Sequence, residues 1–153
     1  MTKRTEEIIA ASKCPCPKCQ DKEAKIDGNL LLGLLVLESK IGRTTTITSG
    51  GRCPAYNKSI GGYISSPHIP DEFGITRALD IQAYGIKPED MAKAAEGIKG
   101  IKRIGIYPNH IHIDAITPRP SKFWYVSQYG TKAVYSGGTK TLKEFIKKIK
   151  GGK

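Results

Sequence analysis

All three histidines of this 153-residue chain fall between positions 68 and 112, in contexts that favour chemistry. His68 closes a run of serine and proline, and Asp80 ends a short apolar run. His110 and His112 alternate with isoleucines in a segment that ends at Asp114, so on a strand these three polar side chains share one face. Two histidines and an aspartate held by rigid strands would provide three ligands for a catalytic zinc ion, with one position left for water.

The residues alone leave a second interpretation open. A lone histidine on a strand is more often a hydrogen-bonded surface or core residue than a metal ligand. What favours a metal is the joint pattern, because all the histidines and one aspartate occur in two clusters that neighbouring strands could bring together. A zinc hydrolase is therefore the first hypothesis.

Length and composition predict a single globular domain over residues 1–153. We also expect the protein to be a monomer. The chain has 39% hydrophobic and 25% charged residues and contains no apolar run of the roughly 20 residues that a membrane-spanning helix needs. No export signal is visible, so we expect synthesis in the cytoplasm and action at the cell wall or periplasm after release, or in a phage particle. A net charge of +11 favours anionic partners, such as an anionic cell envelope or nucleic acid. Much of this charge lies in a predicted basic helix at about 140–153.

Four cysteines occur, three of them in a Cys-rich N-terminal segment of about residues 1–26. They are Cys14, Cys16, Cys19 and Cys53. The spacing of Cys16 and Cys19 suits a zinc knuckle, but no second pair completes one. A disulfide, a structural metal site with a second zinc, and plain packing all remain open.

Hydrophobic periodicity and turn residues predict an α+β fold with a small, largely antiparallel sheet and flanking helices. Asp27 is a suitable N-cap and Gly42 a suitable end for a leucine-rich helix buried on most sides. A long loop is expected from Tyr56 to Pro70. The predicted helices are 3–12, 29–41, about eleven residues from Pro88, and 142–149; the predicted strands are 44–48, 78–83, 104–107, 110–116 and 123–126.

Three separated motifs resemble those of a peptidase family. They are Ser-Gly-Gly-Arg-Cys-Pro at 49–54 with Asn57, Ser-x-His at 66–68 leading to Ala-Leu-Asp-Ile at 78–81, and His-Ile-Asp at 112–114. Together they are similar to the zinc D-Ala-D-Ala carboxypeptidases and L-alanyl-D-glutamate endopeptidases of bacterial peptidoglycan, whose fold is shared with the Hedgehog signalling domain. The resemblance covers about residues 30–115.

This resemblance implies a role for each matching position. His68, Asp80 and His112 would be the zinc ligands, and one catalytic zinc is expected. Arg52, together with Asn57 and Ser66, would bind the peptide substrate, a task that suits the planar guanidinium fork. His110 would transfer protons or stabilise the tetrahedral intermediate, and Asp114 would orient a histidine from outside the ligand set.

Two departures from the family pattern concern the site. The spacer between His68 and Asp80 is longer than usual, so that Asp71 or Glu72 either approaches the metal or forms a solvated loop tip. Asn109 stands where many relatives place an acidic general base, and an amide cannot accept a proton at neutral pH. The base must then be His110, a carboxylate from elsewhere in the chain, or absent; some members of the family carry a His-x-His pair, which favours His110.

The predicted function is zinc-dependent hydrolysis of a peptide bond in the peptide stem of peptidoglycan, by a D,D-carboxypeptidase or an L-alanyl-D-glutamate endopeptidase such as a phage-type lysin. One alternative is a non-catalytic zinc-binding module on the same fold. Another is a basic nucleic-acid-binding protein, which would leave Arg52, His68, Asp80 and His112 without a purpose.

Overall fold

The structure is a computed structural model that describes residues 2–19, 22–117, 121–128 and 132–151. Within these ranges the α-helices are α1 (Lys3–Ala11), α2 (Gly28–Ile41), α3 (Pro54–Ser59), α4 (Pro88–Ala95) and α5 (Leu142–Gly151), with a 3-10 helix at Pro17–Cys19. The strands are β1 (Lys25–Ile26), β2 (Thr46–Ser49), β3 (Ile75–Thr76), β4 (Ala78–Gln82), β5 (Arg103–Ile106), β6 (Ile111–Asp114), β7 (Phe123–Tyr125) and β8 (Val134–Tyr135).

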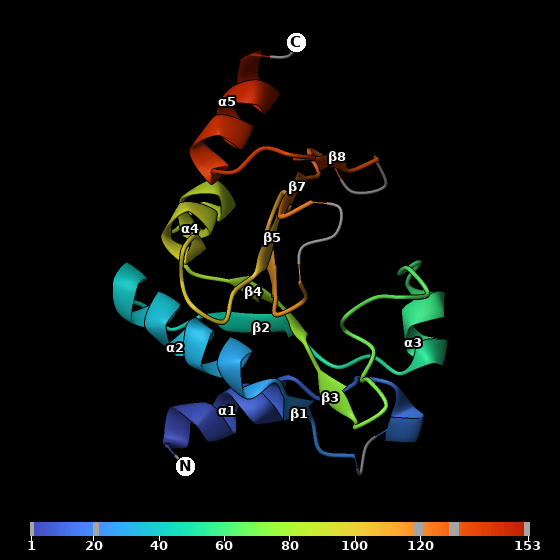
Figure 1. Cartoon of the computed structure of the whole chain (residues 1–153). Helices are drawn as coiled ribbons and strands as arrows, with labels where there is room; N and C mark the ends of the chain where they lie inside the picture. Colours follow the sequence, from blue (N-terminus) through green and yellow to red (C-terminus); the bar gives the residue numbers. More distant parts are fainter. Residues whose placement is uncertain (1, 20–21, 118–120, 129–131, 152–153) are drawn as a thin grey trace.

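A six-stranded sheet in the order β2-β4-β6-β5-β7-β8 forms the centre of the molecule. Its neighbouring strands run antiparallel except for β5 and β7, which are parallel. β1 and β3 form a separate parallel pair. Helices α2, α4 and α5 lie on one side of the sheet, and α3 lies on the other (Figure 1). The predicted α+β class with a largely antiparallel sheet is therefore confirmed.

Helix α2 begins and ends where the sequence predicts. The Asp27 carboxylate accepts hydrogen bonds from the backbone N–H groups of Asn29 (2.9 Å) and Leu30 (3.1 Å), and Gly42 ends the helix with φ = 68°. The expectation that α2 is buried on most sides was wrong, because Leu32 is 62% exposed. The helix buries one face against the sheet and leaves the other in solvent.

The predicted loop from Tyr56 to Pro70 was wrong at its start, where the chain forms α3. Pro54 suits the first turn of this helix, and Cys53 caps it, since its sulfur accepts a 3.4 Å hydrogen bond from the Tyr56 N–H. A cysteine is an unusual N-cap, and a helix this short has almost no periodic pattern. Strands β1, β3 and β8 were also missed, because two residues are too few to show an alternating pattern.

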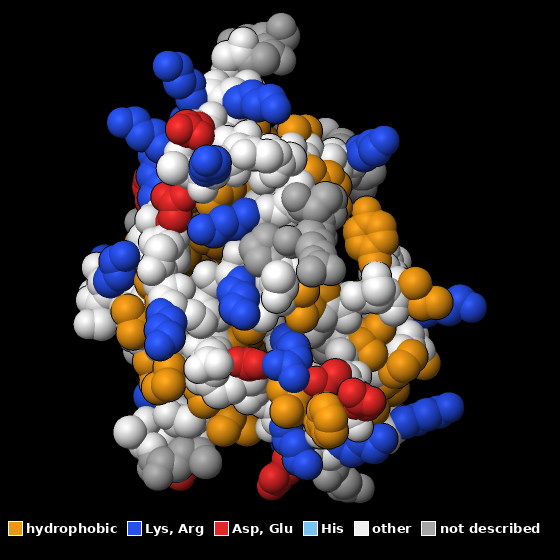
Figure 2. Space-filling model, in the orientation of Figure 1, with side chains coloured by type: hydrophobic (Ala, Val, Ile, Leu, Met, Phe, Trp, Pro, Cys, Tyr) orange, Lys and Arg blue, Asp and Glu red, His pale blue; other side chains and the backbone are white. Residues whose placement is uncertain are grey.

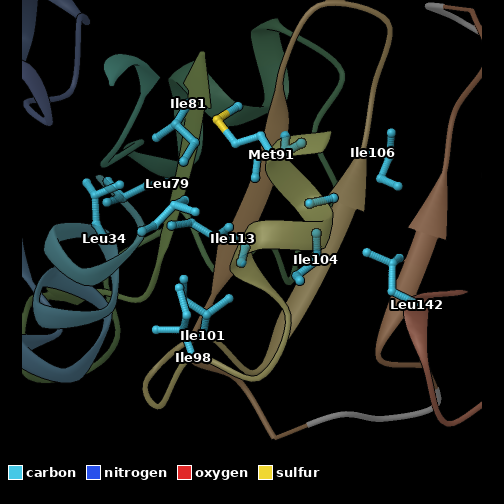
Figure 3. Packing of buried hydrophobic residues seen from close by; sticks show 14 of the residues in the cluster. Leu34, Leu79, Ile81, Met91, Ile98, Ile101, Ile104, Ile106, Ile113 and Leu142 are labelled. Carbon is cyan, nitrogen blue, oxygen red and sulfur yellow. The ribbon is translucent and has the colours of Figure 1, made fainter. Parts of the chain in front are cut away.

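The hydrophobic core lies between the sheet and the helices on its covered face. Alternation along each strand decides which residues enter it: Leu79 and Ile81 from β4 and Ile111 and Ile113 from β6 are fully buried. Figure 3 shows several of these side chains packed with Leu34 and Met91 from the helices. The residues between them in sequence, which include Asp80 and His112, consequently point to the opposite face.

The predicted amphipathic helix at the C-terminal end is α5, whose N-cap is Thr141: its hydroxyl accepts a 3.2 Å hydrogen bond from the Glu144 N–H. Residues 152–153 of the predicted basic segment lie outside the described residues. Lysine and arginine side chains are spread over the face in Figure 2, several of them around α5 at the top of the view. Among the described helices, none has the length and apolar character that crossing a membrane requires.

Candidate metal centre

The pairing of β4 with β6 places an aspartate beside a histidine on the open face of the sheet. Asp80 lies directly opposite His112 in this antiparallel register, and Ser49 at the end of β2 pairs with Asp80 from the other side. His68 comes from the segment that precedes β3 and reaches the same point. The three side chains predicted as zinc ligands are thus brought together by segments up to 44 residues apart in the chain.

Three ligand atoms form a nearly equilateral triangle. His68 Nε2 lies 3.2 Å from Asp80 Oδ1 and 3.2 Å from His112 Nδ1, and the last two atoms lie 3.1 Å apart. Two atoms bound to one tetrahedral zinc ion at 2.0–2.2 Å would be about 3.3–3.6 Å apart. The triangle is therefore close to what a zinc ion needs, with one nitrogen or oxygen offered by each residue.

The remaining ring nitrogen of each histidine has a partner of its own. Nδ1 of His68 lies 2.7 Å from the carbonyl oxygen of Gly50, and Nε2 of His112 lies 2.7 Å from Oδ2 of Asp114. These hydrogen bonds favour the tautomers that leave His68 Nε2 and His112 Nδ1 as acceptors. Both rings are almost fully buried, so their orientation is set before any metal binds.

Asp114 is completely buried and is itself held by an arginine. Arg103, opposite it on β5, donates from Nε (3.0 Å) and Nη2 (2.8 Å) to the carboxylate. The geometry agrees with the predicted position of Asp114 outside the ligand set, against the imidazole of His112. The sequence analysis did not predict a role for Arg103. Alternation along β5 could have indicated it, because Ile104 and Ile106 enter the core and Arg103 therefore points to the opposite face, together with Gly105.

The pKa values of the three candidate ligands are shifted in different directions by their surroundings. Burial lowers the pKa of His68. Burial also acts to lower the pKa of His112, but hydrogen bonds to Asp114 and Asp80 outweigh it and raise this pKa to about 9. For Asp80 burial would raise the pKa, yet the hydrogen bonds from His112 and His68 bring it below its ordinary range. The two neighbouring carboxylates thus favour the protonated form of His112 when no metal is bound.

Arg52 points toward the metal centre from the loop after β2. Its guanidinium donates from Nη2 to Asp80 Oδ2 (3.0 Å), from Nε to the Ser49 hydroxyl (3.0 Å) and from Nη1 to Asn57 Oδ1 (3.4 Å). Oδ1 of Asp80 faces the two histidines while Oδ2 receives the arginine. Arg52 therefore orients one candidate ligand of the triangle.

Several aromatic side chains lie beside the centre, on the side of β5 and β7. The indole of Trp124 lies 4.9 Å from the ring of His112 and donates a 2.9 Å hydrogen bond to the Tyr107 hydroxyl. His110 stacks on Tyr107 with ring centroids 4.5 Å apart, and its Nε2 is 4.0 Å from Asp80 Oδ2. Burial lowers the pKa of His110, which keeps its ring neutral at neutral pH.

The centre opens into a cleft of about 700 Å³. Its lining includes Arg52, Tyr63, Ser66, His110 and Tyr135 besides the three candidate ligands. A cleft of this size can accept a short peptide, and its polar groups converge at the triangle. Tyr63, Tyr107, Trp124 and Tyr135 are lining residues that the sequence analysis did not single out.

The other predicted residues have distinct positions. Ser66 lines the cleft, and its hydroxyl accepts a 3.3 Å hydrogen bond from the His68 N–H. Asn57 is not among the described lining residues: its amide donates to the Tyr63 carbonyl (2.7 Å) and accepts from Arg52, so it orders the loop.

The longer spacer does not bring another ligand to the triangle among the described residues. Asp71 accepts hydrogen bonds from the backbone of Phe73 (2.9 Å) and Ile75 (3.0 Å) and pairs with Arg77 (2.7 Å). Glu72 is exposed, as is Asn109 in the turn between β5 and β6. Of the two expectations for the spacer, the structure agrees with a loop tip.

A triangle of two histidines and one carboxylate that lines an open cleft is typical of mononuclear metal enzymes with three protein ligands. The chain matches the family Peptidase M15 over residues 4–114, well over half of its length, and therefore belongs to that family. Membership implies a zinc-dependent metallopeptidase. No curated protein and no solved structure matches the chain significantly.

Proposed function

We propose that this metallopeptidase hydrolyses a peptide bond in the peptide stem of bacterial peptidoglycan. The observation that carries the proposal is the triangle of His68, Asp80 and His112, whose ligand atoms lie 3.1–3.2 Å apart beside a cleft large enough for a short peptide. The family match supports the peptidase class. The choice of substrate is supported by the motifs around Arg52, His68 and His112, which resemble those of peptidoglycan peptidases.

The three triangle residues would hold the zinc ion, and a bound zinc polarises a carbonyl oxygen and lowers the pKa of a water molecule. Asp114 keeps Nδ1 of His112 available by accepting a hydrogen bond from Nε2. Arg52 holds Asp80 by its outer oxygen, and its guanidinium lines the cleft where a substrate carboxylate or carbonyl would bind. Ser66 lines the same cleft and is the second polar candidate for substrate contact.

His110 is our candidate for proton transfer. Its ring lines the cleft beside the triangle, and its lowered pKa provides a neutral imidazole that can accept a proton. Tyr107, stacked on His110, fixes the plane of the ring. The ring would take this proton from the water that attacks the carbonyl carbon and return it to the amine that leaves when the peptide bond breaks.

The basic surface suits the site of action. Peptidoglycan is surrounded by anionic polymers in many envelopes, and the lysines of α5 provide positive charge away from the cleft. We propose that this charge assists adhesion to the envelope, as in a phage-type lysin.

Two alanine variants of neighbouring histidines test the function. Zinc content and digestion of purified peptidoglycan, followed by mass spectrometry of the fragments, would be measured for the wild type, His112→Ala and His110→Ala. We expect His112→Ala to lose the catalytic zinc and all cleavage. We expect His110→Ala to keep this zinc while kcat falls by about 10²- to 10⁴-fold. A zinc-loaded wild type that releases no fragment would favour the non-catalytic zinc module instead.

A further inference from the structure

A second group of metal-binding side chains lies outside the cleft's triangle. Cys14, Cys19 and Cys53 each direct a sulfur atom to a common point, and the three atoms lie within 4.8 Å of one another. Cys16 lies outside this group but near enough to help lower the pKa of the Cys53 thiol. In Figure 1 the N-terminal segment that follows α1 returns beneath α3, which begins directly after Cys53. Three of the four cysteines therefore meet at one place, and Cys16 lies beside them.

We propose that the four cysteines hold a structural zinc ion through four sulfur atoms, at a site separate from the catalytic centre. Four thiolates around one ion are typical of closed structural zinc sites, in which no position is left for substrate. A single disulfide would use only two of these converging sulfurs. Packing alone would not require three sulfur atoms to point at one another.

The backbone around the cysteines is arranged as thiolate ligands need it. The Cys53 N–H donates a 3.3 Å hydrogen bond to Cys14 Sγ, and the Tyr56 N–H donates to Cys53 Sγ. Such N–H donors stabilise negative charge on sulfur. The 3-10 helix that ends at Cys19 is closed by a 2.8 Å bond from the Cys19 N–H to the Cys16 carbonyl, which brings these two cysteines to one side of a tight turn.

The surroundings offset the charge of such a site. Four thiolates and one Zn²⁺ carry a formal charge of about −2. Lys18 lies between Cys16 and Cys19 in the sequence. A hollow of about 530 Å³ that borders Cys14 and Cys53 is lined by Lys22 and Lys25 and by one acidic residue, Glu23, so its charged lining is basic on balance. This hollow gives a chelator or a metal ion a path to the sulfurs.

The position of Cys53 gives the second site a consequence for the first. Cys53 directly follows Arg52, whose N–H donates to the His68 carbonyl (2.9 Å) and whose guanidinium holds Asp80. The Gly51 N–H donates to the Ser12 carbonyl (2.7 Å), so the same loop is attached to the N-terminal segment. Zinc at the cysteines would therefore fix the loop that positions Arg52, without taking part in the reaction.

The number of zinc ions bound per chain, measured in variants of each site, distinguishes the cysteine site from the catalytic centre. We expect about two zinc ions per chain in the wild type, about one in His112→Ala and about one in Cys14→Ser. Ser12→Ala is the control, because Ser12 borders the same hollow but offers no sulfur, and it should keep both. Loss of all zinc in His112→Ala would overturn the proposal, as would two zinc ions in Cys14→Ser.

Cobalt substitution and thiol counting provide two further readouts of the cysteine site. The Co²⁺-loaded wild type should show intense near-ultraviolet sulfur-to-cobalt charge-transfer absorption, retained in His112→Ala and lost in Cys14→Ser. Alkylation of the chelated, denatured protein without reductant should modify all four thiols; two modified thiols would mean a disulfide and would overturn the proposal. These readouts do not depend on peptidoglycan cleavage, so a failure of the proposed function would leave them unchanged.

Discussion

Asp114 Oδ2 lies 2.7 Å from Nε2 of His112, on the side of the imidazole opposite to Asp80 Oδ1, which lies 3.1 Å from Nδ1. One ring is thus held between two carboxylates: the inner one belongs to the triangle, and the outer one is buried and paired with Arg103. A carboxylate behind a ligating histidine fixes its tautomer and increases its basicity.

Asp114→Asn should weaken zinc binding at the catalytic centre by about 10- to 100-fold, because an amide oxygen is a poorer acceptor for the Nε2–H of His112. A competitive titration with a zinc chelator measures this. Asp71→Asn is the matched control, since Asp71 also pairs with an arginine but lies away from the triangle. Equal zinc affinities in the two variants would contradict the role of Asp114.

Arg52→Lys should lower kcat/KM by about 10- to 100-fold although the positive charge is kept. The guanidinium contacts Asp80, Ser49 and Asn57 from three different nitrogens, a geometry that one ammonium group cannot reproduce. Arg43→Lys, at an exposed position after α2, should have no effect. An unchanged kcat/KM in Arg52→Lys would show that charge alone is sufficient.

Gly105→Ala should destabilise the protein by about 1–3 kcal/mol. A Cβ atom on Gly105, which pairs with His112 across β5 and β6, would overlap the indole of Trp124. Because Trp124 is the single tryptophan and is 8% exposed, its displacement should shift the fluorescence emission to longer wavelength. Gly28→Ala, where no atom lies within 4 Å of the added carbon, should leave the emission unchanged and should not lower the stability to urea.

Glu38→Gln should reduce stability at neutral pH, and its difference from the wild type should shrink in acid. Burial acts to raise the pKa of Glu38, but bonds from Arg4 and from the backbone and hydroxyl of Thr45 lower it below the ordinary 4.5. The ionised carboxylate therefore stabilises the fold above pH 4.5, and this contribution is lost as the pH falls through the lowered value.

Urea unfolding of the Glu38 variant at several pH values tests this. The expected loss at pH 7 is about 1–3 kcal/mol, since hydrogen bonds to a charged group are involved. Glu7→Gln is the matched control: Glu7 pairs with the same Arg4 at 3.4 Å but is 49% exposed, so its replacement should matter little. A constant difference between wild type and Glu38→Gln from pH 7 to pH 3.5 would contradict the assignment.

Much of the fold could be predicted because its signals are local. Asp27 and Gly42 mark the ends of α2, and the alternation from His110 to Asp114 shows which side chains share a face of β6. Capping and alternation depend on a few consecutive residues, so they can be read without knowing where other segments lie. Helix α3 was missed because its cap is a cysteine and its length is six residues.

The identities of the three candidate ligands were likewise available from the sequence, but their meeting point was not. Only the tertiary structure pairs Asp80 with His112, turns Arg52 onto the outer oxygen of Asp80, and places Trp124 over Gly105. It also brings Cys53 to Cys14, 39 residues earlier in the chain. Such contacts join distant segments through strand register and core packing, which depend on the whole chain at once, whereas residue type and local spacing carry the chemistry alone.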